Sequence, residues 1–331
     1  MGDGWRHCRR LSQHGPRRIC GNCLVATPTF SIVSNRPRDL PKVEVMAVSS
    51  LTNKQIAQYD ANGFIVIESV FADTEIQPAL TAIAEITARQ RPLGKQATKL
   101  EWESEPFDGQ RIPRRIYNPV DQRPVFKEIG LSDKMLDKIE SLLGPNIQLH
   151  GCKINIKHAG VGSPVHWHQD LAFSPHTSCD LAACIVYLDP ATEFNGCLQV
   201  IPGQHQKALM DHTVNGQFRG RVTEDLSRRR DVMDCPAPAG SVVIFHCKTP
   251  HRSEANRPSK PRRALILEFR AADAFPIYHH VSVADHEQTA TRLVRGQPLR
   301  TARFEGTSLP VPCAFDESFS YTSIYDIQQS G

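Results

Sequence analysis

Hydrophobic residues recur at helical spacing in the first part of the chain. Thr52 is placed to cap a short helix that ends near Tyr59, Gly63 interrupts it, and Phe64–Ile67 has the composition of a strand. Two longer helices are predicted from apolar stripes, which comprise Leu80, Ile83, Ala84 and Ile86 after Asp73, and Met135, Leu136, Ile139, Leu142 and Leu143 between Ser132 and Gly144. Residues 93–120 are polar and irregular, and no element is predicted there.

From Ile147 onward the pattern changes to short runs rich in Val and Ile, separated by Gly, Pro and Asn. The predicted strands are Ile147–Lys157, Leu181–Leu188, Cys197–Pro202, Ser241–Phe245 and Ala264–Arg270. Helices followed by many short strands favour a mainly β fold with flanking helices, either a β-sandwich or a jelly roll. The polar stretch 204–234 is long for a hairpin loop and is interpreted either as a substrate-contacting loop or as a solvated insertion.

The net charge of +4 is concentrated at the N-terminus, where residues 1–45 hold eight Lys/Arg against three Asp/Glu. That segment carries +5, so the remaining residues sum to −1. Because it lacks hydrophobic periodicity, residues 1–50 are predicted to be a disordered or transit-like extension, and residues 51–331 the folded domain. A zinc site built from Cys8, His14, Cys20 and Cys23 is the alternative for the extension, because Cys20-Gly-Asn-Cys23 has ligand spacing, although a structural site usually shows two such pairs.

The composition of the chain argues against two classes of binding partner. No run approaches the ~18 apolar residues of a membrane span, and the body of the chain is not basic, so neither a membrane nor a nucleic-acid partner is expected. Several of the ten cysteines lie in strand-like segments, and no secretory signal is apparent, which indicates reduced thiols in an intracellular, cytoplasmic protein, or a mitochondrial one if the basic extension is a transit segment. We expect a small-molecule substrate and keep a homodimer open.

The candidate chemistry lies at His168, Asp170 and His251. His168 and Asp170 follow a strand-like run, and His251 follows the apolar segment Val242–Phe245. Two neutral imidazoles and one carboxylate can occupy one face of an octahedral ferrous ion and leave three positions open. These residues are therefore predicted to be the metal ligands and the catalytic centre.

Arg262 lies eleven residues after His251, at the start of the next predicted strand. A dicarboxylate that chelates iron through one end needs a planar, bidentate partner for its other carboxylate, which a guanidinium supplies. Ser253 could donate a hydroxyl to the same carboxylate. The alternative is that Arg262 and Arg263 simply begin a solvated strand.

With these motifs the sequence resembles the phytanoyl-CoA dioxygenase family of iron(II)- and 2-oxoglutarate-dependent oxygenases, from Leu51 to about Arg270. The resemblance is carried by Asp60-Ala-Asn-Gly63-Phe, Leu143-Gly-Pro-Asn-Ile147, His168-Gln-Asp-Leu171, Asn195-Gly-Cys-Leu-Gln-Val-Ile-Pro-Gly-Gln-His205, and His251-Arg-Ser253 with Asn256 and Arg262-Arg263. It implies a cupin-like double-stranded β-helix with iron held by His168, Asp170 and His251. It further implies 2-oxoglutarate anchored by Arg262, with Ser253 and Lys153 as further contacts, although Lys153 could equally extend to solvent.

The resemblance implies a dioxygenase that uses Fe(II), 2-oxoglutarate and O₂ and releases succinate and CO₂ while it oxidises, most simply hydroxylates, a natural-product intermediate or an acyl-CoA. Relatives often carry a tryptophan where this chain has Val186 or Tyr187. Arg114, Arg115 and the arginines of 219–230 could attract an anionic substrate or form a solvated face. The competing hypothesis is a non-redox, cupin-like metal-binding protein or an inactive jelly-roll binding protein.

Overall fold

The computed structural model describes residues 50–88, 100–257, 260–277, 292–299, 301–305 and 324–329 of the 331-residue chain. These residues belong to one compact unit, Ala47–Gly331. The predicted extension 1–50, apart from Ser50, and the candidate zinc ligands Cys8, His14, Cys20 and Cys23 lie outside the described residues.

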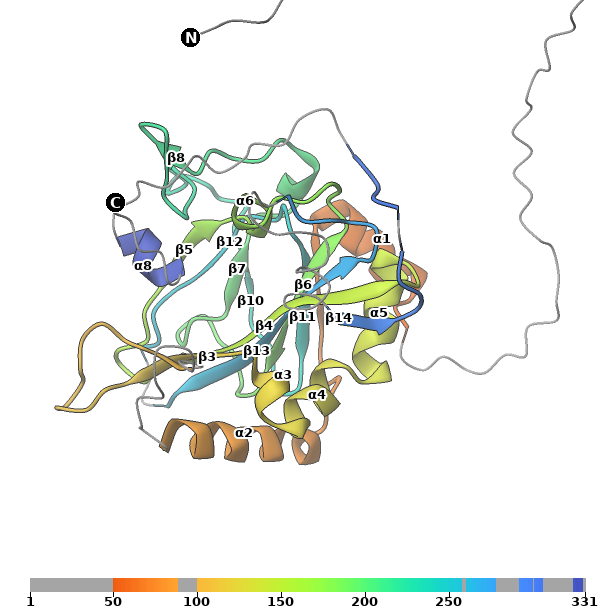
Figure 1. Ribbon diagram of the computed structural model, residues 1–331. Helices are drawn as coiled ribbons and strands as arrows, with labels where there is room; N and C mark the ends of the chain where they lie inside the picture. The colour runs from red at the N-terminus through yellow and green to blue at the C-terminus, as the bar shows by residue number, and fades with distance from the viewer. Residues whose placement is uncertain are drawn as a thin grey trace, which may run out of the picture. The chain divides into compact units, whose positions relative to one another are not determined.

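Two antiparallel sheets carry the fold (Figure 1). The large sheet has the strand order β1-β11-β6-β13-β4-β3-β2, with β14 paired to β4, and the small sheet has the order β10-β7-β12-β5. The strands of the large sheet are β1 (Phe64–Ile67), β2 (Leu100–Trp102), β3 (Pro113–Tyr117), β4 (Ile147–Lys157), β6 (Leu181–Tyr187), β11 (Val242–His246), β13 (Arg262–Ala271) and β14 (Arg292–Arg295). The small sheet contains β5 (Val165–His168), β7 (Leu198–Val200), β10 (Met233–Cys235) and β12 (His251–Ser253).

The helices surround the sheets and follow the predicted stripes. They are α1 (Asn53–Asn62), α2 (Asp73–Ala88), α3 (Pro119–Gln122), α4 (Pro124–Gly130), α5 (Asp133–Leu143), α6 (Asp170–Phe173) and α8 (Ile324–Gln329), with a short 3₁₀ turn η1 (Gln204–Gln206). Thr52 caps α1 through a reciprocal capping box with Gln55, and Gly63 ends the helix at φ 78°, as the sequence predicts. Ser132 likewise caps α5.

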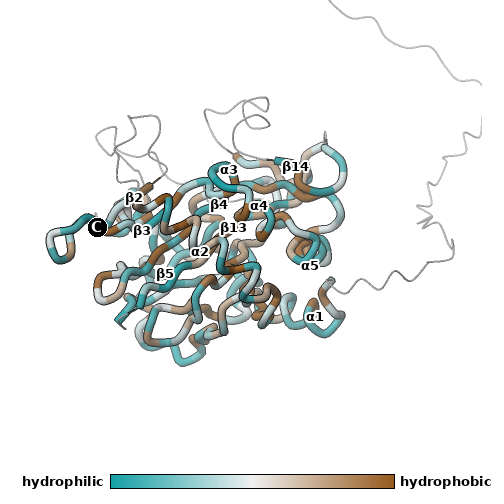
Figure 2. The backbone as a smooth tube through the Cα atoms, turned by 90° about the horizontal axis from the view of Figure 1, so that it is seen from below, coloured by the Kyte–Doolittle hydropathy of each residue, from teal (hydrophilic) through white to brown (hydrophobic). Residues whose placement is uncertain are grey.

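Two hydrophobic cores lie on opposite faces of the large sheet. Residues 182, 184 and 186 of β6 face α2, α4 and α5, whereas residues 183, 185 and 187 face the small sheet. Alternation along the strand therefore places Tyr187, not Val186, between the sheets. In Figure 2 hydrophobic stretches recur along β4 and β13, the central strands of this arrangement. The prediction of a mainly β fold with flanking helices is confirmed.

Two polar stretches differ from their predictions. Residues 93–120 are not irregular throughout, because β2 and β3 form there and extend the large sheet. Arg114 and Arg115 on β3 are each only 4% exposed, so the solvated-face interpretation of this pair is wrong. Their burial is possible because Glu101 on β2 accepts a hydrogen bond from Arg114 and forms an ion pair with Arg115.

Residues 204–234 contain η1, β10 and a small hairpin of β8 (Thr213–Val214) and β9 (Gln217–Phe218). Phe218 packs edge-on against Phe173 of α6, with ring centroids 5.0 Å apart. This stretch therefore packs against α6. Within the described chain, no helix is long and apolar enough to cross a membrane.

Candidate active site

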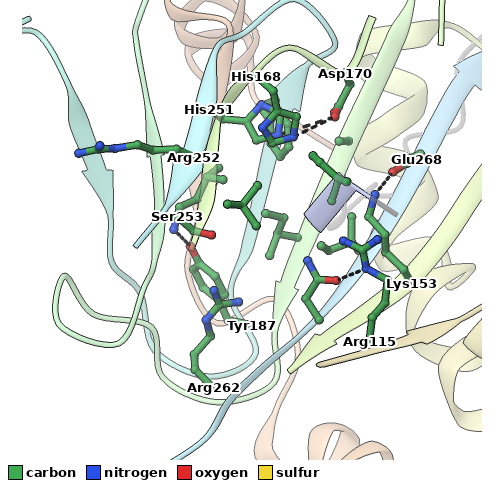
Figure 3. A pocket seen from close by; sticks show the side chains of 18 residues that line it. Arg115, Lys153, His168, Asp170, Tyr187, His251, Arg252, Ser253, Arg262 and Glu268 are labelled. Carbon is green, nitrogen blue, oxygen red and sulfur yellow. Dashed lines mark hydrogen bonds and ion pairs between the residues drawn. The ribbon is translucent and has the colours of Figure 1, made fainter. Parts of the chain in front are cut away.

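The two histidines predicted to bind metal lie opposite each other on neighbouring strands. His168 ends β5, His251 begins β12, and the two residues are partners in the antiparallel register. Asp170 follows as the first residue of α6 and points toward both imidazoles (Figure 3). Its Oδ1 lies 3.8 Å from His168 Nε2 and 3.7 Å from His251 Nε2. The ligand atoms of all three lie within 4.8 Å of one another, so the structure brings the predicted triad together.

Backbone carbonyl groups fix the tautomer of each histidine. His168 Nδ1 lies 2.8 Å from the carbonyl oxygen of His166, and His251 Nδ1 lies 3.0 Å from that of Thr249. A carbonyl oxygen only accepts hydrogen bonds, so each Nδ1 must be the protonated donor. The lone pair of each Nε2 is then free and directed toward Asp170, the arrangement that a metal-binding histidine requires.

Burial shifts the pKa values of His168 and Asp170. It lowers the pKa of His168 well below the usual value, and the neighbouring His251 lowers it further, so this imidazole is neutral. Burial also raises the pKa of Asp170, which His251 and Lys153 partly offset. A neutral imidazole is a metal ligand, and a divalent cation would stabilise the partly buried carboxylate of Asp170 as an anion. The donor set therefore fits Fe(II).

Arg262 and Ser253 lie with the triad around one cavity of about 60 Å³. Figure 3 shows Arg262 and Tyr187 at the end of this cavity away from the triad. Arg262 is 5% exposed, and its Nη2 donates to the carbonyl oxygen of Gly196 at 2.5 Å. Its buried Nε has no hydrogen-bond partner among the described residues. A buried, incompletely satisfied guanidinium fits an anionic ligand, which argues against a solvated strand start.

Lys153 also lines this cavity, but its nearest partner is a residue that the sequence did not point to. Its Nζ donates to Glu268 Oε1 at 2.7 Å. Burial by itself raises the pKa of Glu268, but Lys153 and His150 more than offset this and lower it to about 2. The sequence signal that could have identified Glu268 is an acidic residue inside the apolar run of β13. The structure excludes the alternative that Lys153 extends to solvent, since it points into the cavity (Figure 3).

Arg115, for which the sequence left open a substrate-attracting role or a solvated position, lies at the site. Its Nε donates to Asn155 Oδ1 at 3.0 Å and its Nη1 donates to the Tyr117 hydroxyl at 3.2 Å. The side chain lines the first cavity and also a second one of about 300 Å³. Polarity alone had suggested a surface position, and only the pairing of β3 with β4 brings Arg115 beside Lys153.

The second cavity opens beside the metal site. His168, Asp170, Lys153 and Glu268 line both cavities, and the second is otherwise lined by a mixture of polar and apolar residues that includes His150, Phe173, Ser174, Leu181, Cys247 and Phe269. Its volume is at the lower end of the range for small-molecule sites. None of the residues described between 204 and 234 lines either cavity.

Sequence comparison finds relatives over most of the chain. The model of the phytanoyl-CoA dioxygenase (PhyH) family matches residues 59–264. A probable alpha-ketoglutarate-dependent hypophosphite dioxygenase of Stutzerimonas stutzeri is 30% identical over 267 residues, which cover 78% of this chain and 91% of that protein. The human peroxisomal phytanoyl-CoA dioxygenase is 26% identical over 286 residues, covering 82% of each chain.

Structure comparison finds the same fold. EctD from S. alaskensis, solved with bound Fe, aligns with a TM-score of 0.60 at 23% identity and covers 77% of this chain and 87% of its own. The same protein solved with 2-oxoglutarate and 5-hydroxyectoine gives a TM-score of 0.58 at 23% identity, over 76% and 88% of the two chains. At this identity the likeness establishes the fold, and the predicted jelly roll is confirmed.

The predicted enzyme class, an Fe(II)- and 2-oxoglutarate-dependent dioxygenase that acts on a small molecule, is confirmed by these relatives, and the non-redox or inactive alternative is not favoured. The chain belongs to the phytanoyl-CoA dioxygenase family.

Proposed function

We propose that this protein couples the oxidation of a small-molecule substrate to the conversion of 2-oxoglutarate and O₂ into succinate and CO₂, with Fe(II) held by His168, Asp170 and His251. The observation that carries the proposal is the convergence of the three ligand atoms at one end of a cavity that also contains Arg262. When bound, Fe(II) supplies the redox chemistry that no side chain of this site has.

The side chains of the first cavity are assigned to the co-substrate. Arg262 and Ser253 bind its distal carboxylate, because the guanidinium is buried and Ser253, 9% exposed, lines the same cavity. Arg115 adds positive charge along one side, which favours entry of a dianion, whereas Glu268 balances the charge of Lys153 in the same cavity. Tyr187 closes the end of the cavity, since its hydroxyl is already used by Leu198 N–H and the carbonyl oxygen of Cys235.

The second cavity is assigned to the substrate. It shares His168 and Asp170 with the first cavity, so a bound molecule would present its reacting bond to the metal site while water is excluded. Its volume of about 300 Å³ supports a small polar molecule or natural-product intermediate over a complete acyl-CoA. Hypophosphite, the substrate in the name of the relative from Stutzerimonas stutzeri, belongs in the first panel to be tested.

The proposal is tested without knowing the substrate. Anaerobic addition of Fe(II) and 2-oxoglutarate should give the weak visible charge-transfer band of a ferrous chelate, and Asp170→Ala should abolish it. Asp121→Ala, which removes a carboxylate paired with Arg292 at the surface, is the control and should keep the band. A folded wild-type protein without the band would refute the assignment.

The class of substrate is then identified by measuring which candidate compounds stimulate the release of succinate. The panel comprises hypophosphite, acyl-CoAs, terpenoids and amino acids. We expect stimulation by a small member of the panel and none by the acyl-CoAs. An intracellular, cytoplasmic location and a homodimer are further proposals, tested by fractionation and by the mass of the protein in solution.

A further inference from the structure

Helix α8 lies next to the active site although it is outside residues 59–264, which the family model matches. Figure 1 shows the helix beside β5, the strand that carries His168. Ile324, its first residue, lines both cavities together with His168 and Asp170. The helix therefore contributes directly to the space in which co-substrate and substrate are expected.

Gln328 fixes α8 to the strand that bears a metal ligand. Its side chain is 2% exposed. Its Oε1 accepts a hydrogen bond from the backbone N–H of His166 at 2.9 Å, and its Nε2 donates to the carbonyl oxygen of Gly220 at 2.7 Å. A buried amide satisfied on both sides specifies one position for the helix, because displacement would leave these groups unpaired.

Tyr325 links the same helix to the cationic side of the cavities. It is 3% exposed. The guanidinium carbon atoms of Arg114 and Arg115 lie 4.4 Å and 4.8 Å from the centroid of its ring. Cation–π contacts of this kind are strengthened by burial, so the ring helps to fix the orientation of both guanidinium groups. Arg115 is the one that lines the cavities.

We propose that α8 is a wall of the active site, in which Ile324 closes the space shared by the two cavities and Tyr325 is a positioning residue for Arg115. The inference rests on the proposed function, since it assigns the first cavity to 2-oxoglutarate. The wall slows the escape of the co-substrate and keeps water from the reacting atoms. It also limits the size of the substrate.

The first test measures the dissociation constant of 2-oxoglutarate by anaerobic titration of the charge-transfer band. Tyr325→Ala should raise the Kd by about 3- to 30-fold, the range that corresponds to the loss of a buried cation–π contact. Tyr325→Phe retains the ring and should restore a Kd close to that of wild type. Phe304→Ala, which removes an exposed side chain, is the control for general effects of truncation. An unchanged Kd in Tyr325→Ala would overturn the inference.

The second test needs neither metal nor co-substrate. In the metal-free protein, Gln328→Ala should accelerate hydrogen exchange at the His166 amide by about tenfold or more, because that amide loses its acceptor. The amide of Ile154, within β4, is the internal reference and should not change. Unchanged exchange at His166 would show that α8 is not held against β5. Absence of the band in wild type would instead refute the proposed function, while the exchange measurement would still report on the helix.

Discussion

Arg262 and Arg263 are neighbours at the start of β13, and their side chains serve opposite faces of the large sheet. Arg262 is buried beside the carbonyl oxygen of Gly196 and lines the co-substrate cavity. Arg263 forms a bidentate pair with Asp189, with Nε–Oδ2 and Nη2–Oδ1 distances of 2.7 Å and 2.6 Å. Alternation along the strand thus separates two chemically identical residues into one for ligand binding and one for structure.

Arg262→Gln should raise the KM for 2-oxoglutarate by about 10- to 100-fold, because charge-assisted hydrogen bonds to the distal carboxylate are lost. Binding of Fe(II) alone should be unaffected. The measurement is succinate formation as a function of 2-oxoglutarate concentration. Arg263→Gln is the matched control, and its KM should stay within about twofold of wild type. Equal effects of the two substitutions would contradict the assignment.

Lys153→Met should destabilise the fold by about 1–3 kcal/mol. The loss is smaller than the ~3–5 kcal/mol for breaking a fully buried pair, because the side chains of Lys153 and Glu268 remain 27% and 29% exposed. Lowering of the Glu268 pKa to about 2 contributes stability that is present above the unfolded pKa near 4.5 and is lost as the pH falls toward 2. Urea unfolding of the substituted protein should therefore depend less on pH in this window, and an unchanged dependence would exclude a role for the pair.

Gly63→Ala should cost more stability than Gly109→Ala. Both glycines have positive φ, 78° and 70°, so both substitutions introduce backbone strain of about 1 kcal/mol. A Cβ at Gly63 would additionally lie 2.4 Å from His205 Nδ1 and 2.5 Å from Thr249 Oγ1, whereas one at Gly109 meets nothing within 4 Å. We expect a further ~1–3 kcal/mol at Gly63 alone, measured by urea unfolding of both variants.

Acid should destabilise the protein between about pH 6.5 and pH 3, in part through His246. Burial, with smaller contributions from His205 and Lys248, lowers the pKa of this imidazole to about 3. In the unfolded chain His246 takes up a proton near pH 6.5, whereas in the folded chain it stays neutral down to about pH 3. The free energy of unfolding therefore falls as the pH decreases through this window. His246→Gln can still accept from the backbone N–H of Lys248 and should flatten the decline. A slope identical to that of wild type would rule out His246 as a contributor.

Local signals were sufficient for the elements whose ends are defined by their own residues. Thr52, Gln55 and Gly63 specify α1 through capping and a left-handed turn, and the bounds predicted for β4 agree with the structure. The spacing of His168, Asp170 and His251 predicted the triad, because strand ends and the following turn place such residues at one mouth of a jelly roll.

Other features depend on partners that are distant in sequence. Strand β3 was not predicted, because Arg114 and Arg115 are charged and their burial depends on Glu101 and on Tyr325 of α8. Glu268 was missed for the same reason, since its role beside Lys153 follows from the pairing of β13 with β4. Sequence patterns report which face of an element is apolar, but not which charged groups neutralise one another.

The register that pairs His168 with His251 also bears on the order of events during folding. The two residues belong to strands β5 and β12, and the six strands β6 to β11 lie between them in the chain. Such a long loop must close before the imidazoles meet, and long-range pairing of this kind is slow compared with helix formation. The ligand set is consequently a product of completed strand pairing in the small sheet. Metal binding followed over time during refolding should therefore report when the strands of the small sheet pair. We expect the metal to bind late, after the helices have formed.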